Sequence, residues 1–267
     1  MAREEYSLPR SGDVDKIYDI HNTRWEGAEL RLSDSQVSHL YDDGLIRVMR
    51  VNGTVTGVLF IHRMFTGGAV PDPYQFRLWE RLVHATAPGI APDTIIMWSI
   101  DVPAGSPKGL GTRLIAAAKE EFRATPYLAT FSPVKGYKSF CQEIISRGAI
   151  PKRRVEESGI YLFLATSMKR GYEAYLRYLQ DVPDTHFMMP EDWYRGRGWG
   201  SLCPVNRFHA VRNGASLVGV WPAGPGARPC SPFTVMYSYK GFETTVAESF
   251  RKLPDQVLGR RAVFNLV

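Results

Sequence analysis

The sequence predicts an α/β fold with an α+β mixed sheet, arranged in two packed halves. Asn52-Gly53, a dipeptide suited to a type I′ turn, joins two segments rich in β-branched residues. A nearly continuous apolar run, Thr94–Val102, is typical of a strand buried on both faces, and a helical pattern follows it after a glycine-rich turn. No polar linker interrupts the chain, so we expect residues 1–167 to form one half that packs against a second half, residues 168–267.

The composition is that of a globular protein. Of 267 residues, 44% are hydrophobic and 22% are charged, which excludes disordered and fibrous classes. The apolar runs are too short for a membrane span, and the charged N-terminus has no signal-peptide core. The three cysteines lack CxxC spacing, which favours reduced thiols and a cytoplasmic location over disulfides or a zinc site. The net charge of +6 suits an anionic partner without choosing among nucleic acid, a phosphate ligand and an acidic carrier protein.

The first half is expected to begin with two helices, the hairpin and a third helix. Ser33 is suited to cap the second helix, because Gln36 follows it at the spacing of a capping box. In order, the expected ranges are Val14–Ile20, Ser33–Tyr41, Leu45–Val51, Val55–His62 and Tyr74–Ala87.

Helices and strands alternate after the buried strand. The glycine-rich turn Gly105–Gly111 leads into a helix over residues 112–122, which places Leu114, Ile115, Ala118 and Phe122 on one face. The expected elements that follow are strand Tyr127–Ser132, helix Tyr137–Ser146, strand Gly159–Ala165, helix Tyr172–Leu179, loop Pro183–Gly200, a second hairpin of Phe208–Arg212 and Leu217–Trp221 around Asn213-Gly214, and strand Phe233–Tyr239.

The glycine-rich turn has the features of a pyrophosphate cradle. It places backbone N–H groups at the positive end of a helix, and Lys108 adds a formal charge beside them. The turn matches neither the G-x-G-x-x-G dinucleotide pattern nor the P-loop pattern. It resembles the acyl-CoA loop of the GNAT (acyl-CoA N-acyltransferase) fold, Q/R-x-x-G-x-G/A, with Ser106 at the first position. The resemblance implies that the CoA-binding residues are Lys108, Gly109, Leu110, Gly111 and Thr112. The alternative is a tight turn without a ligand.

Two further segments resemble malonyl-CoA decarboxylases. Residues 130–137, TFSPVKGY, resemble the TLSPIPGF-like segment of these enzymes, and Ser132 occupies the place of its catalytic serine. Residues 204–209, PVNRFH, followed by Asn213-Gly214-Ala215, resemble the PVARFHLxNGA segment, and His209 corresponds to its catalytic histidine. One residue more separates His209 from the Asn-Gly pair here.

The same segments are also similar to the GNAT-like decarboxylase domains of curacin-type polyketide loading modules. Those domains carry a similar FHxxxGA stretch and a downstream Arg-Pro, which here is Arg228-Pro229. The long helical N-terminal domain of malonyl-CoA decarboxylases has no counterpart, so the chain is closer to the compact polyketide type. In that type a threonine takes the serine's role, which leaves Thr130 as the alternative to Ser132.

These resemblances imply decarboxylation of a malonyl or methylmalonyl thioester, bound to CoA or to an acyl carrier protein, through an enolate. The thioester oxygen then needs donors, from backbone amides at the end of the buried strand and from the hydroxyl of Ser132 or Thr130. His209 is expected to supply the proton that reaches carbon, because imidazole titrates near neutral pH. Arg228 would grip the carboxylate and Trp25 would desolvate it. The remaining histidines form no cluster with ligand spacing, so we expect no metal and no cofactor beyond the CoA or phosphopantetheine thioester.

Other interpretations remain open at this stage. His209 also fits a core histidine, Ser132 a turn residue, Arg228 a surface charge and Trp25 plain core. The chain also fits an acyltransferase that moves an acyl group from CoA to an amine or a carrier thiol, or a non-catalytic acyl-CoA or carrier-binding module. Residues 193–199 mix arginine with aromatic residues but belong to no basic helix, so we expect no nucleic-acid partner. The expected partner is an acyl-CoA or an acyl carrier protein, with no membrane, and the oligomeric state is left open.

Overall fold

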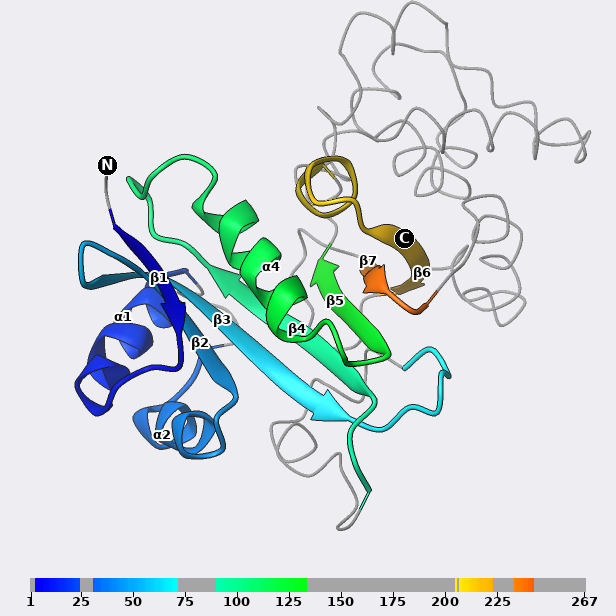
Figure 1. Cartoon of the computed structure of the whole chain (residues 1–267), viewed down its shortest axis with the longest axis horizontal. Helices are drawn as coiled ribbons and strands as arrows, with labels where there is room; N and C mark the ends of the chain where they lie inside the picture. The colour runs from blue at the N-terminus through cyan, green and yellow to red at the C-terminus, as the bar shows by residue number, and fades with distance from the viewer. Residues whose placement is uncertain are drawn as a thin grey trace, which may run out of the picture. The chain divides into compact units, whose positions relative to one another are not determined.

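A computed structural model describes residues 3–24, 31–71, 90–133, 205, 207–222 and 233–242 (Figure 1). The chain forms two compact units. Unit 1 consists of residues 1–131 and 239–241, and unit 2 consists of residues 132–238 and 242–267. The boundary expected between residues 167 and 168 lies outside the described residues and stays a prediction.

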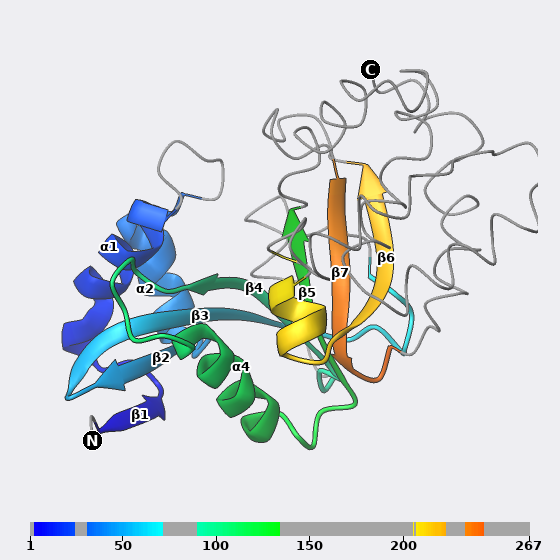
Figure 2. The same cartoon turned by 90° about the horizontal axis from the view of Figure 1, so that it is seen from above.

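Unit 1 is built on a mixed sheet. Its strands are β1 (Glu4–Ser7), β2 (Ile46–Val51), β3 (Thr54–Met64), β4 (Thr94–Asp101) and β5 (Tyr127–Pro133), and they lie side by side in this order. The first three pairings are antiparallel and the pairing of β4 with β5 is parallel. The predicted mixed sheet is therefore confirmed, and β4, which the sequence predicts as a buried strand, lies between β3 and β5 (Figure 2).

The hairpin between β2 and β3 forms as the sequence predicts. Asn52 has a φ of 52° and Gly53 a φ of 83°, the two positive values that a type I′ turn requires. The strands meet directly beside the turn, where Val51 pairs with Thr54. The local dipeptide thus sets the register of the hairpin.

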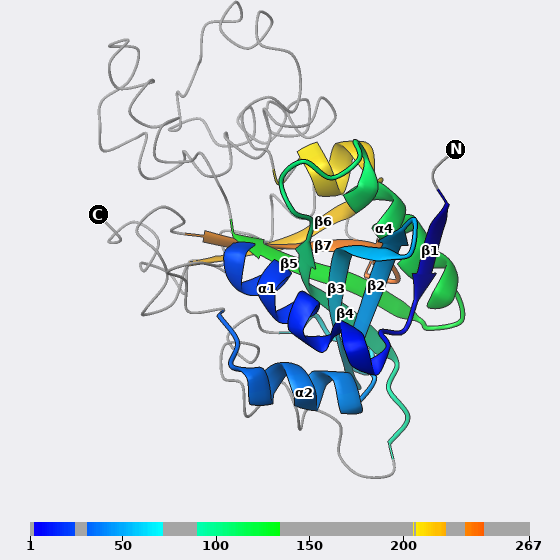
Figure 3. The same ribbon diagram turned by 90° about the vertical axis from the view of Figure 1, so that its left-hand side faces the viewer.

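Helices cover both faces of this sheet. On one face lie α1 (Val14–Arg24) and, beside it, α2 (Asp34–Asp42), and on the other lies α4 (Leu110–Glu121) (Figures 2 and 3). The predicted capping box of α2 is present: Ser33 Oγ accepts a hydrogen bond from the Gln36 amide at 3.3 Å, and Gln36 Oε1 accepts one from the Ser33 amide at 2.8 Å. The first helix runs four residues beyond its predicted end at Ile20.

The core of unit 1 fills the space between sheet and helices with aliphatic side chains. Gly57 in β3 faces α4: a Cβ at this position would lie in ordinary van der Waals contact, 3.6 Å from the side chain of Leu110 and 3.8 Å from that of Leu114. Full burial of a large apolar side chain stabilises the folded state by about 1.5–3 kcal/mol. Residues buried to 2% exposure or less in this cluster are Ile17, Val37, Leu40, Ile46, Val48, Val58, Leu59, Phe60, Ile61, Met97, Leu110, Leu114, Ala118 and Leu128.

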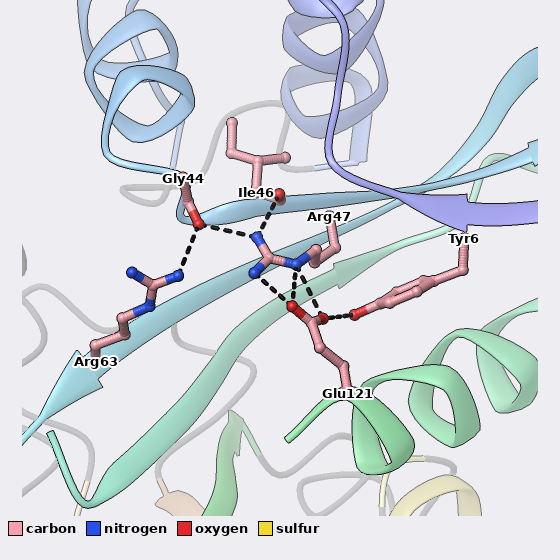
Figure 4. Close-up of polar contacts among 6 residues, drawn as sticks. All are labelled: Tyr6, Gly44, Ile46, Arg47, Arg63 and Glu121. Atoms are coloured by element: carbon pink, nitrogen blue, oxygen red, sulfur yellow. Dashed lines mark hydrogen bonds and ion pairs between the residues drawn. The ribbon is translucent and has the colours of Figure 1, made fainter. Parts of the chain in front are cut away.

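A polar clamp fastens the C-terminal end of α4 to the sheet (Figure 4). Arg47 Nε donates to Glu121 Oε1 at 2.7 Å and to Oε2 at 2.9 Å, and Arg47 Nη2 donates to Oε1 at 2.6 Å. Arg47 Nη1 donates to the Gly44 carbonyl at 2.8 Å, while the Tyr6 hydroxyl donates to Glu121 Oε2 at 2.6 Å. Burial, followed by the contact with Glu121, raises the pKa of Tyr6. Because one carboxylate joins β1, β2 and α4, the clamp fixes the direction in which α4 crosses the sheet.

The described part of unit 2 includes the last two residues of β5, Ser132 and Pro133, a short helix and a hairpin. The helix is the π-helix η3 (Arg207–Arg212), and the antiparallel strands are β6 (Ser216–Pro222) and β7 (Phe233–Lys240), the last two residues of which belong to unit 1 (Figure 2). The strands predicted near 217–221 and 233–239 are confirmed.

The strand predicted over Phe208–Arg212 is wrong, because this segment is helical and β6 pairs with β7 instead. Gly214 has a φ of 70°, its amide donates to the Ala210 carbonyl at 3.1 Å, and the Ala215 amide donates to the His209 carbonyl at 3.0 Å. These bonds cap the helix C-terminus in a left-handed conformation. Asn213-Gly214 therefore ends a helix, whereas the sequence suggested a hairpin turn.

Several predicted elements lie outside the described residues. They are the helices Tyr74–Ala87, Tyr137–Ser146 and Tyr172–Leu179, the strand Gly159–Ala165 and the loop Pro183–Gly200. In the ranges that the structure describes, none of the helices has the length and hydropathy of a membrane span.

Candidate active site

The predicted CoA turn forms the N-terminus of α4. Gly109 is the N-cap residue with a φ of 78°, and Gly105 has a φ of 84°, so both adopt backbone conformations that favour glycine. The amides of Gly111 and Thr112 belong to the first turn of the helix, where N–H groups have no intrahelical acceptor. Leu110 is buried and Lys108 is exposed. The turn thus offers free amides and a cation to an anion, as the sequence suggests.

Arg113 braces this turn, and sequence reasoning missed it. Its Nη1 donates to the Lys108 carbonyl at 2.9 Å, and its Nε lies 2.7 Å from Glu4 Oε2 on β1. A cation in the first turn of a helix is unfavourable to the helix dipole, so its presence there is a signal that a partner or a structural task offsets the cost. The two contacts join the turn to the edge strand of unit 1.

The two central strands separate beyond their first four pairs. The β4–β5 ladder runs from Thr94 with Tyr127 to Met97 with Thr130. Beyond that pair β4 continues to Asp101, and within the described residues this last part pairs with β3 alone. The register with β3 shifts at the same place, leaving Trp98 as the extra residue of a β-bulge. Among the described strands, the ladder between β4 and β5 therefore ends at Met97, and the ladder between β3 and β4 continues to Asp101.

The hydroxyl of Thr130 is used within unit 1. It is 2% exposed, and its Oγ1 donates a short hydrogen bond to the Met97 carbonyl. Since this bond occupies the only hydroxyl hydrogen, Thr130 is poorly placed to donate to a substrate oxygen.

Ser132 and His209 meet in unit 2. Ser132 Oγ lies 3.0 Å from His209 Nε2, although the two residues are 77 positions apart in the chain. The His209 ring stacks on Tyr237, with centroids 5.0 Å apart and planes inclined by 23°, and it meets Phe208 edge-on at 4.9 Å. The helix η3 and its Gly214 cap place the imidazole, and β5 places the hydroxyl. The structure brings these two predicted residues into hydrogen-bonding contact.

His209 is neutral at pH 7. Its residue exposure is 5%, and burial lowers the pKa to about 3. This differs from the expectation that the imidazole titrates near neutral pH. A neutral imidazole has one N–H and one lone pair, so the hydrogen bond with Ser132 runs from Nε2–H to Oγ or from Oγ–H to Nε2 according to the tautomer. The pair can therefore orient the serine hydroxyl toward a third atom.

Two other predicted site residues, Trp25 and Arg228, lie outside the described residues. Within the ranges that the structure does describe, no group of three or more His, Cys, Asp or Glu side chains is arranged to hold a metal ion.

Sequence reasoning also missed a buried polar cluster in unit 1. His21 Nδ1 lies 2.7 Å from Asp101 Oδ2, and Ser99 Oγ donates to both carboxylate oxygens of Asp101 at 3.0 and 2.9 Å. The signal for this cluster is an aspartate that closes an otherwise apolar strand, in the sequence TIIMWSID. A buried carboxylate needs partners, so the aspartate alone predicts a polar neighbour.

Comparison with solved structures identifies the fold. No model of a known protein family matches the chain, and no curated protein matches it in sequence. Among solved structures, the loading GNATL domain of CurA from Lyngbya majuscula matches with a TM-score of 0.57 and 12% identity over 89% of this chain and 98% of that domain. The GphF GNAT-like decarboxylase, solved with isobutyryl-CoA, matches with a TM-score of 0.53 and 16% identity over the same shares, 89% and 98%. The chain thus has a mixed α/β, GNAT-like fold.

Proposed function

We propose that this protein decarboxylates a malonyl or methylmalonyl thioester, presented by CoA or by an acyl carrier protein, through an enolate. The observation that carries the proposal is the hydrogen bond of 3.0 Å between Ser132 Oγ and His209 Nε2. The two residues come from segments that resemble the catalytic segments of malonyl-CoA decarboxylases. Two proteins that share the fold are a GNAT-like decarboxylase and the loading domain of CurA, which supports the same class of chemistry.

Binding is assigned to the glycine-rich turn of unit 1. The amides of Gly111 and Thr112 and the ammonium of Lys108 would receive the pyrophosphate of CoA. A phosphopantetheine carried on an acidic protein would gain from the net charge of +6, because opposite charges speed encounter. Arg228 remains the proposed partner of the substrate carboxylate and Trp25 its proposed apolar neighbour.

The chemical step needs stabilisation of negative charge on the thioester oxygen. When the bond between the α-carbon and the carboxylate breaks, its electron pair moves into the enolate and carbon dioxide leaves. A Ser132 hydroxyl whose oxygen accepts from His209 Nε2–H can donate its own hydrogen to the enolate oxygen. One such donor is worth about 3 kcal/mol of barrier. The bond from Thr130 to the Met97 carbonyl supports the choice of Ser132 over Thr130 for this role.

The enolate carbon must then gain one proton, so that one malonyl thioester and one proton yield one acetyl thioester and one carbon dioxide. We assign delivery of this proton to the Ser132–His209 pair, with solvent as its ultimate source. Because His209 is neutral at pH 7, it acts by passing a proton along the pair and holds no charge before the substrate binds.

Product analysis tests the proposal against the two alternatives. The protein is incubated with malonyl-CoA, and in a parallel arm with a malonyl-loaded acyl carrier protein, and the products are weighed by mass spectrometry. Acetyl-CoA or an acetyl carrier formed without an acceptor is the expected result. Transfer of an intact acyl group to an added amine or thiol would show an acyltransferase. Thermal stabilisation by CoA with no product from either substrate would show a binding module.

A further inference from the structure

One peptide group of the glycine-rich turn joins Lys108 to Gly109, and its orientation matters for binding. Gly109 has a φ of 78°, and because glycine has no Cβ, the peptide group before it can rotate at little cost. This group carries the Lys108 carbonyl and the Gly109 N–H, which point in opposite directions in a trans peptide. The direction of the carbonyl therefore decides on which side of the turn the Gly109 amide can donate.

Arg113 holds this carbonyl. Its Nη1 donates to the Lys108 carbonyl at 2.9 Å, and it lies so close to the turn that a Cβ on Gly109 would come within 3.2 Å of it. In a helix that began one turn earlier, the Thr112 amide would donate to the same carbonyl. Here the guanidinium bonds that carbonyl, and among the described residues the amides of Gly109, Gly111 and Thr112 have no hydrogen-bond acceptor. The turn therefore keeps three amide donors for an anion.

Glu4 in turn holds the arginine. Glu4 Oε2 on β1 lies 2.7 Å from Arg113 Nε, and the two side chains are 30% and 39% exposed. The carboxylate offsets the charge of the guanidinium, which is unfavourable near a helix N-terminus. The charge that the turn offers to an anion then comes from its amides and from Lys108, which is exposed. The ion pair fixes the guanidinium and adds little net charge to the turn.

We propose that Arg113 and Glu4 are positioning residues for the pyrophosphate of CoA. They hold the Lys108 carbonyl on one side of the turn, so that the Gly109 amide donates to the pyrophosphate on the other. The proposal rests on the binding assigned to this turn under the function proposed above. A partly exposed ion pair contributes little to overall stability, so we expect its effect in the affinity for CoA.

Arg113→Met tests the role of the guanidinium, because it keeps an unbranched side chain and removes the donors. We expect the Kd of CoA, measured by calorimetry, to rise about tenfold, the effect of losing a hydrogen bond to a charged group. The KM for malonyl-CoA should rise by a similar factor while kcat stays within about twofold, since the bond is lost equally from the bound substrate and the transition state. Arg113→Lys should recover part of the affinity, because an ammonium can still donate to the Lys108 carbonyl.

Glu4→Gln separates positioning from direct contact with the ligand. Without the carboxylate the guanidinium is no longer fixed, so the proposal predicts a higher Kd for CoA. If Arg113 itself contacted the pyrophosphate, removal of a neighbouring negative charge would instead lower the Kd. Glu5→Gln is the matched control, because it removes the same charge from the next residue of β1, where Glu5 contacts the exposed Arg10 at 3.5 Å. Its Kd for CoA should stay near that of the wild type.

Two results would overturn the positioning role. They are an unchanged Kd for CoA in Arg113→Met at an unchanged melting temperature, and tighter binding of CoA by Glu4→Gln. If Arg113→Met does not fold, Glu4→Gln and Arg113→Lys decide the matter. A wild type that binds CoA but yields no acetyl product contradicts the proposed decarboxylation alone, because the Kd values still decide the role of Arg113. A wild type that does not bind CoA overturns both.

Discussion

Two of the buried histidines, His21 and His209, differ in partner and consequence. His21 in unit 1 meets the carboxylate of Asp101 at 2.7 Å, and His209 in unit 2 meets the hydroxyl of Ser132 at 3.0 Å. A carboxylate fixes the imidazole as a donor at the contacting nitrogen, whereas a hydroxyl can donate or accept. The first contact suits a fixed joint between α1 and β4, and the second suits a group that passes protons. Burial alone therefore does not reveal which histidine acts in the chemistry.

Replacing His209 should give the largest effect. His209→Gln replaces the imidazole with an amide of similar reach, which cannot perform the proton relay proposed for His209, so kcat for decarboxylation should fall about 1,000-fold. Binding of CoA should stay unchanged, because the turn of unit 1 is untouched. Product formation is followed by mass spectrometry, with His39→Gln as the control. Turnover near the wild-type rate would assign the chemistry to another residue.

Replacing the hydroxyl partner should come next. Ser132→Ala removes the proposed donor to the enolate oxygen and should lower kcat about 100-fold. The matched variant Thr130→Val removes the bond to the Met97 carbonyl, so it should lower the melting temperature with a smaller change in kcat. If Thr130→Val costs more turnover than Ser132→Ala at equal folding, the hydroxyl assignments are reversed.

The pH dependence of the free energy of unfolding tests the burial of His209, and the effect expected here is smaller than those on kcat. The pKa of His209 falls from its ordinary 6.5 to about 3 in the folded state, so the unfolded chain binds more protons between these values. The contribution of the neutral, buried His209 to the free energy of unfolding is therefore fully present above pH 6.5. It decreases by about 1.4 kcal/mol per pH unit as the pH falls below that value. His62, with its pKa lowered to about 4 by burial, adds a similar loss.

Urea unfolding of the wild type and of His209→Gln at pH 7, 6 and 5 measures this difference. As the pH falls, the free energy of unfolding should decrease less steeply in the variant than in the wild type, and the two slopes should differ by about 1 kcal/mol per pH unit. Equal slopes in the two proteins would mean that His209 is not buried in its neutral form.

The smallest expected effects concern two glycines that follow asparagine. Gly53 and Gly214 have φ values of 83° and 70°, and within the described part of the chain a Cβ at either position would meet no heavy atom within 4 Å. Substitution by alanine should therefore cost only the backbone strain, about 1 kcal/mol at each site. We expect Gly214→Ala also to lower kcat, since Gly214 caps the helix that carries His209, while Gly53→Ala should leave kcat unchanged. Equal kcat values in the two folded variants would contradict the role of the cap.

The same two Asn-Gly dipeptides show what the local sequence can predict about the backbone and what it cannot. Asn52-Gly53 has positive φ at both residues and makes a hairpin, whereas only Gly214 has positive φ in the second pair, which ends a helix. Glycine after asparagine suits both structures, because each requires the left-handed conformation. The flanking segment decides between them, and here η3 forms where an extended segment was expected.

The candidate site also combines features that the local sequence predicts with contacts that it does not predict. The glycine-rich turn was predictable, because its amides, its glycines and its cation lie within eight residues of one another, Gly105–Thr112. Ser132 and His209 were identified through a resemblance to known segments, since nothing in their spacing of 77 residues predicts contact. The pair of His21 and Asp101, 80 residues apart, gave only the weak signal of an acid at the end of an apolar strand.

The sequence by itself determined the capping box, the first hairpin, the buried central strand and the turn that precedes α4. The strand is predicted by its run of apolar residues, and the other three features depend on backbone preferences and hydrogen bonds between residues only a few positions apart. The tertiary structure decided which histidine contacts a carboxylate and which contacts a hydroxyl. It also decided that the Thr130 hydroxyl donates its hydrogen to the Met97 carbonyl. These contacts close long stretches of chain, and burial of apolar surface, which has no direction of its own, is what drives such closure.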